Sequence, residues 1–285
     1  MKNSRSFFLK IATLLLAVLM TAAAASACTP KKTTGKIDKK TETGLLDIGE
    51  TFTFGRYEQN NDPEAKEEIE WLVIDREDGK ALVISVAGLD AVQYNEKGGD
   101  TTWETSTARK WLNETFISEA FTQEEAKAIL TTTVSGDANS KTKVEGGNDT
   151  SDKIFLLSID EVEMYMDANE RKASPTAYAI ANGAQASTSK TAYCWWFLRT
   201  PGSSTSFVAY VDVNGFISTN GALTQVINNT VRPAFWIDVK AFKVIWDELH
   251  KTPTPAPSAT PAPEENETAT PEEFETVVPD VTEAP

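Results

Sequence analysis

Apolar and polar residues alternate along the first part of the chain with the two-residue period of half-buried β-strands. Residues 48–59, IGETFTFGRYEQ, place Phe52 and Phe54 between polar positions and predict a strand that ends at Gly55. Residues 69–89, IEWLVIDREDGKALVISVAGL, contain two β-rich runs joined by Asp78 and Gly79. This pair tolerates the positive φ of a tight turn, so the pattern predicts a hairpin and an antiparallel meander.

Three later stretches have helical spacing behind a capping residue. They are WETSTARKWLNETF, capped by Ser106, then FTQEEAKAIL, with a capping box of Thr122 and Glu125, and DKIFLLSIDEVEMYM, with a capping box of Ser158 and Glu161. In the last stretch we expect a buried strand to pass directly into the helix. Residues 135–149 are a loop by composition.

The last third of the chain again has strand patterns. CWWFLRT, residues 194–200, predicts a short buried strand that Pro201 and Gly202 end. SFVAYVDVNGFIST predicts a hairpin with Asn214-Gly215 at its turn, and VRPAFWIDV predicts an edge or bulged strand because it contains Pro233. Strands at both ends of a helical middle predict an α+β fold, a single mainly antiparallel domain at residues 45–250 with two or three helices.

The N-terminus predicts export. Residues 1–27 combine early positive charges with the apolar run IATLLLAVLM and end in small residues, as a signal peptide does. AASAC resembles a bacterial lipobox, in which Cys28 is acylated, although Ala25 stands where the usual lipobox has Leu. We therefore expect a lipid anchor at Cys28 on the outer face of the cytoplasmic membrane, with secretion as the alternative. Residues 28–44 predict a disordered tether.

Residues 251–285 predict a disordered Pro/Thr/Glu-rich acidic tail with eight acids. A solvated repulsive tail and a partner-binding segment both fit this composition. The whole chain has a net charge of −15, which argues against nucleic acid and against anionic membrane as partners, so membrane contact is expected through the lipid anchor only.

Cysteine and histidine usage excludes several chemistries. The chain contains two cysteines, Cys28 and Cys194, and a single histidine, His250, next to the tail. A Ser-His-Asp or Cys-His arrangement and a His-ligated metal site are not expected from this inventory. No cofactor is predicted, and carboxylate chemistry and oxygen-ligated calcium are what remain.

Five motifs in order resemble a family of uncharacterised domains on bacterial cell-surface and secreted proteins. They are WETSTARKWLN, AFTQEEAKAI, DKIFLLSIDEVEMY, WWFLRTPG and VRPAFWI. More distantly, the last third is similar to C-type-lectin-like domains, including the sulfatase-modifying domains. That resemblance implies a C-type-lectin-like architecture in which the first and last strands lie together. The lectin calcium–sugar motif, the lectin disulfides and the cysteine pair of the modifying enzymes are not found here, so their chemistry does not carry over.

The two adjacent tryptophans and two arginines need separate interpretations. On a strand Trp195 and Trp196 face opposite ways, so they predict core positions rather than one binding platform. Arg199 and Arg232 lie within apolar strands, where a buried guanidinium needs partners. We expect ion pairs with carboxylates such as Asp152, Glu161 or Asp212, while recognition of a ligand carboxylate or sugar hydroxyls is the alternative.

A surface-anchored, non-catalytic domain that binds an extracellular glycan, wall component or protein is the expected function. The expected mechanism is stacking of the ligand on one or two of Trp103, Tyr193 and Trp195. Loop positions in the resembled fold imply polar contacts from Arg199, Asp212, Asn214, Asn228 and Asn229. Calcium binding is a competing hypothesis for the loop that contains Asp137, Asn139, Glu145, Asn148, Asp149 and Asp152. The sequence is also compatible with a structural or assembly lipoprotein and with a wall-polysaccharide hydrolase that uses two of Glu104, Glu161 and Asp212.

Overall fold

The alternating N-terminal pattern forms the main antiparallel sheet of the molecule. A computed structural model describes residues 46–250 and contains this sheet in the order β1-β2-β3-β9. Its strands are β1 (Thr51–Tyr57), β2 (Glu67–Glu77), β3 (Lys80–Ser85) and β9 (Ala234–Asp238). Asp78 and Gly79 form the predicted turn between β2 and β3, with φ of 43° and 81°.

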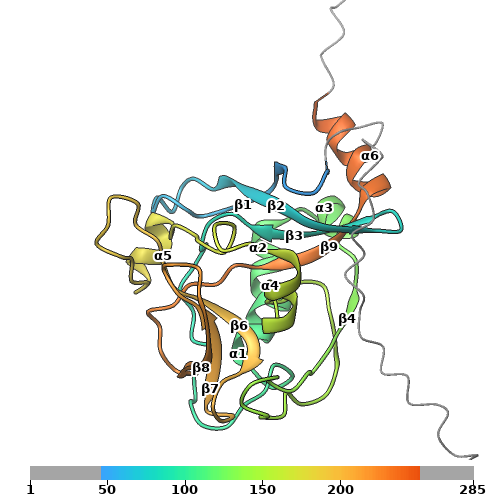
Figure 1. Cartoon of the computed structure of the whole chain (residues 1–285). Coiled ribbons are helices and arrows are strands. Elements are labelled where there is room, and N and C mark those ends of the chain that lie inside the picture. Colours follow the sequence, from blue (N-terminus) through green and yellow to red (C-terminus); the bar gives the residue numbers. More distant parts are fainter. Residues whose placement is uncertain (1–45, 251–285) are drawn as a thin grey trace, which may run out of the picture.

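A second, three-stranded antiparallel sheet lies at the other end of the molecule from the first (Figure 1). It consists of β6 (Trp196–Pro201), β7 (Phe207–Val211) and β8 (Ile217–Leu223). β4 (Thr132–Val134) and β5 (Thr150–Asp152) pair separately. The predicted hairpin turn lies between β7 and β8, and the predicted end of the 194–200 strand coincides with Pro201 at the end of β6.

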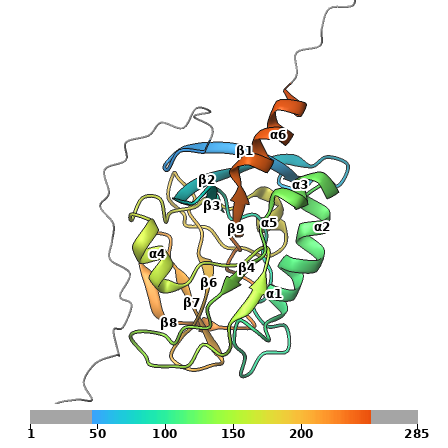
Figure 2. The same ribbon diagram turned by 90° about the vertical axis from the view of Figure 1, so that its right-hand side faces the viewer.

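Five helical segments occur in the described residues. The first runs continuously through α1 (Thr107–Trp111), a π-helical turn (Leu112–Phe116) and α2 (Ile117–Ala120), and α3 (Gln123–Ala128) follows it. The others are α4 (Ile159–Tyr165), α5 (Ala177–Ala181) and α6 (Val239–Leu249). The predicted caps at Ser106, Thr122 and Ser158 are all present, the last two as complete capping boxes. Figure 2 shows α6 projecting beyond the main sheet, above α2 and α3.

Three expectations about the fold need correction. The helix number exceeds two or three because α5 and α6 were not expected. β9 pairs with β3, so the first and last strands lie at opposite edges of one sheet rather than side by side. Residues 153–157 form no strand before α4 and make only a single bridge, between Phe155 and Ala234. The α+β class and the mainly antiparallel pairing are confirmed.

Aromatic packing under the main sheet joins it to the first helical segment. Trp71 of β2 is fully buried and donates its indole N–H to the carbonyl oxygen of Phe54 at 2.7 Å. Its ring meets that of Phe235 in β9 with centroids 4.6 Å apart and that of Phe121 at 6.1 Å, and the rings of Phe121 and Phe235 also contact each other at 5.8 Å. Burial of rings of this size contributes about 2–3 kcal/mol each. This cluster fixes α2 and α3 against the sheet.

Candidate functional site

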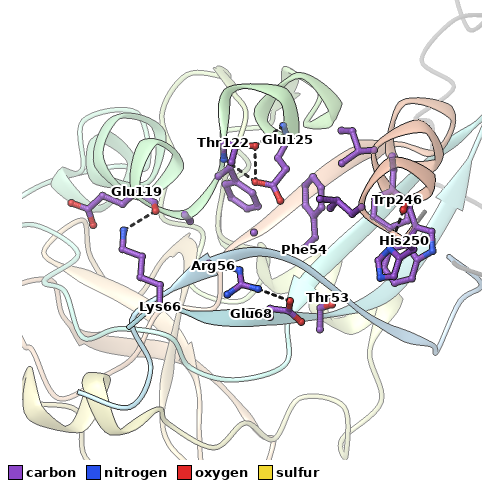
Figure 3. Close-up of a pocket in the computed structure, with 16 residues that line it drawn as sticks. Thr53, Phe54, Arg56, Lys66, Glu68, Glu119, Thr122, Glu125, Trp246 and His250 are labelled. Carbon is purple, nitrogen blue, oxygen red and sulfur yellow. Dashed lines mark hydrogen bonds and ion pairs between the residues drawn. The ribbon is translucent and has the colours of Figure 1, made fainter. Parts of the chain in front are cut away.

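A groove with a volume of about 560 Å³ lies between β1, the α2–α3 segment and α6 (Figure 3). Its floor is apolar and is made by three buried phenylalanines, one from each wall. The ring of Phe54 lies 5.4 Å from that of Phe121 and 5.6 Å from that of Phe242, centroid to centroid. These contacts hold the three walls at fixed separations.

The wall formed by α6 presents apolar side chains to the groove at helical spacing. Asp238 begins the helix, and its side chain accepts a hydrogen bond from the Ala241 N–H at 2.8 Å. Phe242 is buried one turn later, and Ile245, Trp246 and Leu249 then line the groove. The far end of this wall is therefore partly exposed apolar surface.

An aromatic stack stands at the open end of the groove. The imidazole of His250 lies against the indole of Trp246 with ring centroids 3.9 Å apart and planes 19° apart. His250 Nδ1 also lies 2.9 Å from the Trp246 carbonyl oxygen. Both rings line the groove, so a ligand there can meet an aromatic face.

Gly55 brings β1 close to the helices. It lies at a break in the β1–β2 register with φ of 69°, which glycine adopts readily. A Cβ at this position would lie 2.6 Å from both the Ala120 carbonyl oxygen and the Phe121 ring. The strand that was expected to end at Gly55 instead continues through this bulge to Tyr57.

Charged groups surround the groove, with Arg56, Lys66 and Glu68 on the strand side and Glu119 and Glu125 on the helix side. On the β1 side, Arg56 pairs with Glu68 at 2.8 Å, and Lys66 Nζ donates to the Glu119 carbonyl oxygen at 2.9 Å. Glu119 and Glu125 belong to the helix side, where the Glu125 carboxylate accepts a hydrogen bond from the Thr122 N–H. Figure 3 shows Lys66 reaching across to Glu119, while Arg56 is joined to Glu68.

The sequence-predicted ligand residues do not line this groove. Trp103 is only 1% exposed and donates its indole N–H to Asp152 at 2.9 Å, so it presents no ring face to a ligand. Arg199 is 3% exposed, and the cavity beside it has a volume of only about 10 Å³, room for about one water. The expected ligand-binding roles of Trp103 and Arg199 are therefore inconsistent with their positions.

The two buried arginines are satisfied in different ways. Arg199 forms the expected ion pair with both carboxylate oxygens of Glu161, and its Nη1 also donates to the Leu156 carbonyl oxygen. Arg232 donates to backbone carbonyls of Ser85 and Glu170, at 2.8 and 3.2 Å. Burial lowers the pKa of Arg232 to about 10.

The expectation that a carboxylate pairs with Arg232 is therefore wrong. Its guanidinium lies 4.8 Å above the buried ring of Trp196, a cation–π contact. Asp152 instead pairs with Arg109 at 2.7 Å. No described residue supplies a carboxylate to Arg232 at ion-pair distance.

Tyr193, Trp195, Asn228 and Asn229 lie in neighbouring loops away from the groove. The Trp195 carbonyl accepts from the Thr230 N–H at 2.7 Å, which brings the segment after Asn229 alongside Trp195. Trp195 and Tyr193 are half-buried, whereas Trp196 is fully buried, as the opposite directions of adjacent strand side chains require. Their predicted ligand contacts stay predictions.

Asp212 and Asn214 form the turn between β7 and β8. The Asp212 carboxylate accepts the N–H groups of Asn214 and Phe216 at 2.8 and 2.9 Å. This turn chemistry accounts for an aspartate at the end of β7. The turn does not test the expected ligand contacts of Asp212 and Asn214, which stay predictions.

The loop expected to bind calcium uses its oxygens internally. Asn139 is buried and its side chain bonds Pro201 and Thr219 carbonyls and the Lys141 N–H. Asp149 accepts the Gly136 N–H, and Asp152 accepts from Arg109. Within residues 46–250, no three His, Cys, Asp or Glu side chains gather as a metal site would require.

The three expected hydrolytic carboxylates have separate partners. Glu161 pairs with Arg199, Glu104 accepts from the Asn148 side chain at 3.0 Å, and Asp212 belongs to the hairpin turn. Glu104 lines a cavity beside Arg109 and Asp152, and neither Glu161 nor Asp212 lines that cavity.

Sequence reasoning missed α6, and with it the groove. The signal was available, because Val239, Phe242, Ile245, Trp246 and Leu249 follow an Asp N-cap at helical spacing. We expected the domain to close on the strand before them. In the part of the chain that the structure describes, no helix, α6 included, is long and apolar enough to span a membrane.

Comparison with known proteins gives a family but no activity. Residues 78–239, more than half of the chain, match the family model described as a domain of unknown function, DUF6273. No curated protein and no solved structure matches the chain. The match includes the α2–α3 wall of the groove, while β1 and all but the first residue of α6 lie outside it. The chain therefore belongs to the DUF6273 family, which carries no catalytic assignment.

Proposed function

We propose that this chain is an exported, non-catalytic binding domain whose groove holds an extended apolar peptide segment of an extracellular protein. One observation carries the proposal: a groove of about 560 Å³ has a phenylalanine floor and an aromatic stack at its mouth. Concave sites with apolar linings and a few polar groups at the edge are typical ligand sites.

The lining favours apolar side chains over sugar hydroxyls. A sugar needs several polar groups free to bond its hydroxyls, besides a ring on which to stack. Here the floor consists of the rings of Phe54, Phe121 and Phe242. Filling the floor with apolar side chains adds about 25 cal/mol for each Å² removed from water and needs no new polar partner.

The position of β1 favours an extended ligand. β1 is an edge strand of the main sheet, and four consecutive residues, 53–56, line the groove. Four consecutive strand residues span about 10 Å, so the groove follows β1 over that length. Edge strands bind peptides by strand addition, with alternate side chains entering pockets.

Charge further defines the partner. Arg56 and Lys66 are the bases on the strand side of the groove, where Glu68 is the acid, and Glu119 and Glu125 are acids on the helix side. A matching peptide carries acidic residues beside its apolar ones where it faces Arg56 and Lys66. Complementary charges of this kind set orientation and association rate more than affinity.

Export and anchoring complete the proposal. The signal peptide, the acylated Cys28 and the tether to residue 44 lie outside the described residues, and the sequence supports them. They place the groove outside the cell, on the membrane surface. A C-type-lectin-like architecture is likewise part of this proposal, supported by the motif resemblance.

A displayed library of random twelve-residue peptides, selected on the full chain, tests the proposal. We expect enriched peptides with apolar side chains at alternate positions. Leu249→Asp should weaken their binding at least tenfold, because it places a charge in the groove wall. Val244→Asp is the matched control, since Val244 is 67% and Leu249 66% exposed on the same helix, and only Leu249 lines the groove.

Equal binding to both variants would contradict a groove site. Soluble wall polysaccharides are titrated in parallel. Glycan binding that Leu249→Asp abolishes, without any enriched peptide, would replace the peptide ligand with a sugar.

A further inference from the structure

We propose that residues 274–281 of the chain's own C-terminal region dock in the groove and compete with the external partner. This inference rests on the peptide-binding function proposed above and names a second, internal occupant of the same site. The consequence is an autoinhibited domain, in which the internal segment and the external partner compete for the same groove.

Composition singles out this segment. Between residues 251 and 285 the chain is rich in Pro, Thr, Ala and Glu, and its larger apolar side chains are Phe274, Val277, Val278 and Val281. All of them lie within eight residues. In an extended chain Phe274 and Val278 point to the same side, four positions apart, as strand addition along β1 requires.

Connectivity makes the segment a local ligand. His250, the last described residue, itself lines the groove, and 23 residues separate it from Phe274. An extended chain of that length reaches about 80 Å, far more than a return to the groove demands. A covalently linked ligand has an effective concentration of about 1 mM, so even weak intrinsic affinity gives substantial occupancy.

Charges near the segment match the β1 side of the groove. Glu272, Glu273 and Glu275 surround Phe274, while Arg56 and Lys66 stand on the strand side of the rim. The Arg56–Glu68 pair is exposed, with 64% and 54% of the two side chains accessible, and such pairs are worth little. Exchanging Glu68 for a carboxylate of the segment therefore costs little.

Occupancy by the internal segment lowers the apparent affinity for any other ligand. A partner binds only the fraction of molecules whose groove is free, so its apparent Kd rises by the inverse of that fraction. If the internal segment fills the groove nine-tenths of the time, the partner's affinity falls about tenfold.

A labelled synthetic peptide of residues 272–283 provides the test, titrated into the full chain. We expect weak binding to the wild type and at least tenfold tighter binding to a Phe274→Asp, Val278→Asp double variant, whose groove is vacated. Thr268→Asp with Thr270→Asp is the matched control, because it adds the same two charges to the same region outside the apolar cluster. This control should bind like the wild type.

Equal affinity for the wild type and the Phe274→Asp, Val278→Asp chain would overturn the proposal, as would absence of binding to both. The library-selected peptides separate this failure from failure of the groove itself. If they bind both chains equally and lose binding on Leu249→Asp, the groove function stands and the internal occupant is rejected. If Leu249→Asp affects neither peptide, both proposals fail.

Discussion

Arg199 and Arg232 carry charged guanidinium groups into the apolar interior of the molecule. A buried guanidinium needs partners, and this requirement correctly predicted the Arg199–Glu161 pair. The same requirement assigned a carboxylate to Arg232, where backbone carbonyls of Ser85 and Glu170 and the Trp196 ring take that role. Backbone carbonyls occur at every position, so side-chain patterns in the sequence do not reveal them.

Replacing Glu161 with Gln should destabilise the fold by about 3 kcal/mol, because Arg199 is left buried without its counter-charge. Gln retains the carbonyl needed for the Ser158 capping box, so the substitution isolates the charge. Urea unfolding measures the change. Glu163→Gln, an exposed position on α4, serves as control and should change stability by less than about 0.5 kcal/mol. Equal stability of the two variants would contradict a role for the pair.

Asp90 should give the fold a pH dependence that comes from a single side chain. Burial raises its pKa, although hydrogen bonds from the side chains of Asn182 and Tyr57 and from the Ala91 N–H oppose the shift. The pKa of Asp90 in the folded state lies above the unfolded value of about 3.9. Its stabilising contribution to the free energy of unfolding is therefore complete below about pH 3.9 and is lost as the pH rises through the folded-state pKa.

Denaturant unfolding of the wild type and Asp90→Asn between pH 4 and 8 measures this effect. The stability of the wild type relative to the variant should be greatest near pH 4 and decline as the pH rises. Parallel pH profiles for the two proteins would mean that Asp90 does not titrate differently in the folded state.

At the scale of elements, the turns and helix caps that depend on neighbouring residues were predicted correctly. The Asp78-Gly79 and Asn214-Gly215 turns and the three helix caps need only residues a few positions apart, and all are present. α5 was missed because its small residues have no clear period. The bulge at Gly55 was misread as a strand end, since glycine favours both and the contact with Ala120 that decides between them is distant in sequence.

Gly55→Ala should cost at least about 2 kcal/mol more stability than Gly79→Ala. Both positions have positive φ, of 69° and 81°, so both substitutions strain the backbone. Only at Gly55 does the new Cβ meet other atoms, the Ala120 carbonyl and the Phe121 ring at 2.6 Å. Thermal and urea unfolding of the two variants compare them. Equal losses would show that β1 can move away from the helices without cost.

At the scale of the whole molecule, the sheet order and the groove were beyond prediction. The groove joins β1, the α2–α3 segment and α6, which are far apart in the chain and meet through packing that includes Phe54, Phe121 and Phe242. The resemblance to C-type-lectin-like domains directed attention to the last third of the chain. The expected pairing of first and last strands is not observed, because β9 joins β3.

Anchoring is a prediction about the intact protein in its cell. If Cys28 is the anchor proposed above, Cys28→Ser should release the protein from membranes into the soluble or secreted fraction, because the variant lacks the thiol to which an acyl group would be attached. Phase partition in a detergent that separates on warming measures the change. Equal partition of the wild type and the variant would contradict an anchor at Cys28, and plain secretion would follow if both are found in the aqueous phase.

The central claim is that the groove beside α6, and not the region around Trp195, binds the ligand. Fluorine NMR of the full chain labelled with 5-fluorotryptophan tests it most directly, with each resonance assigned by single Trp→Phe variants. On titration with a library-selected peptide, the Trp246 resonance should shift saturably while the Trp195 resonance stays in place. A saturable shift of Trp195 with Trp246 unmoved would contradict the claim and return the binding site to the strand that begins at Trp196.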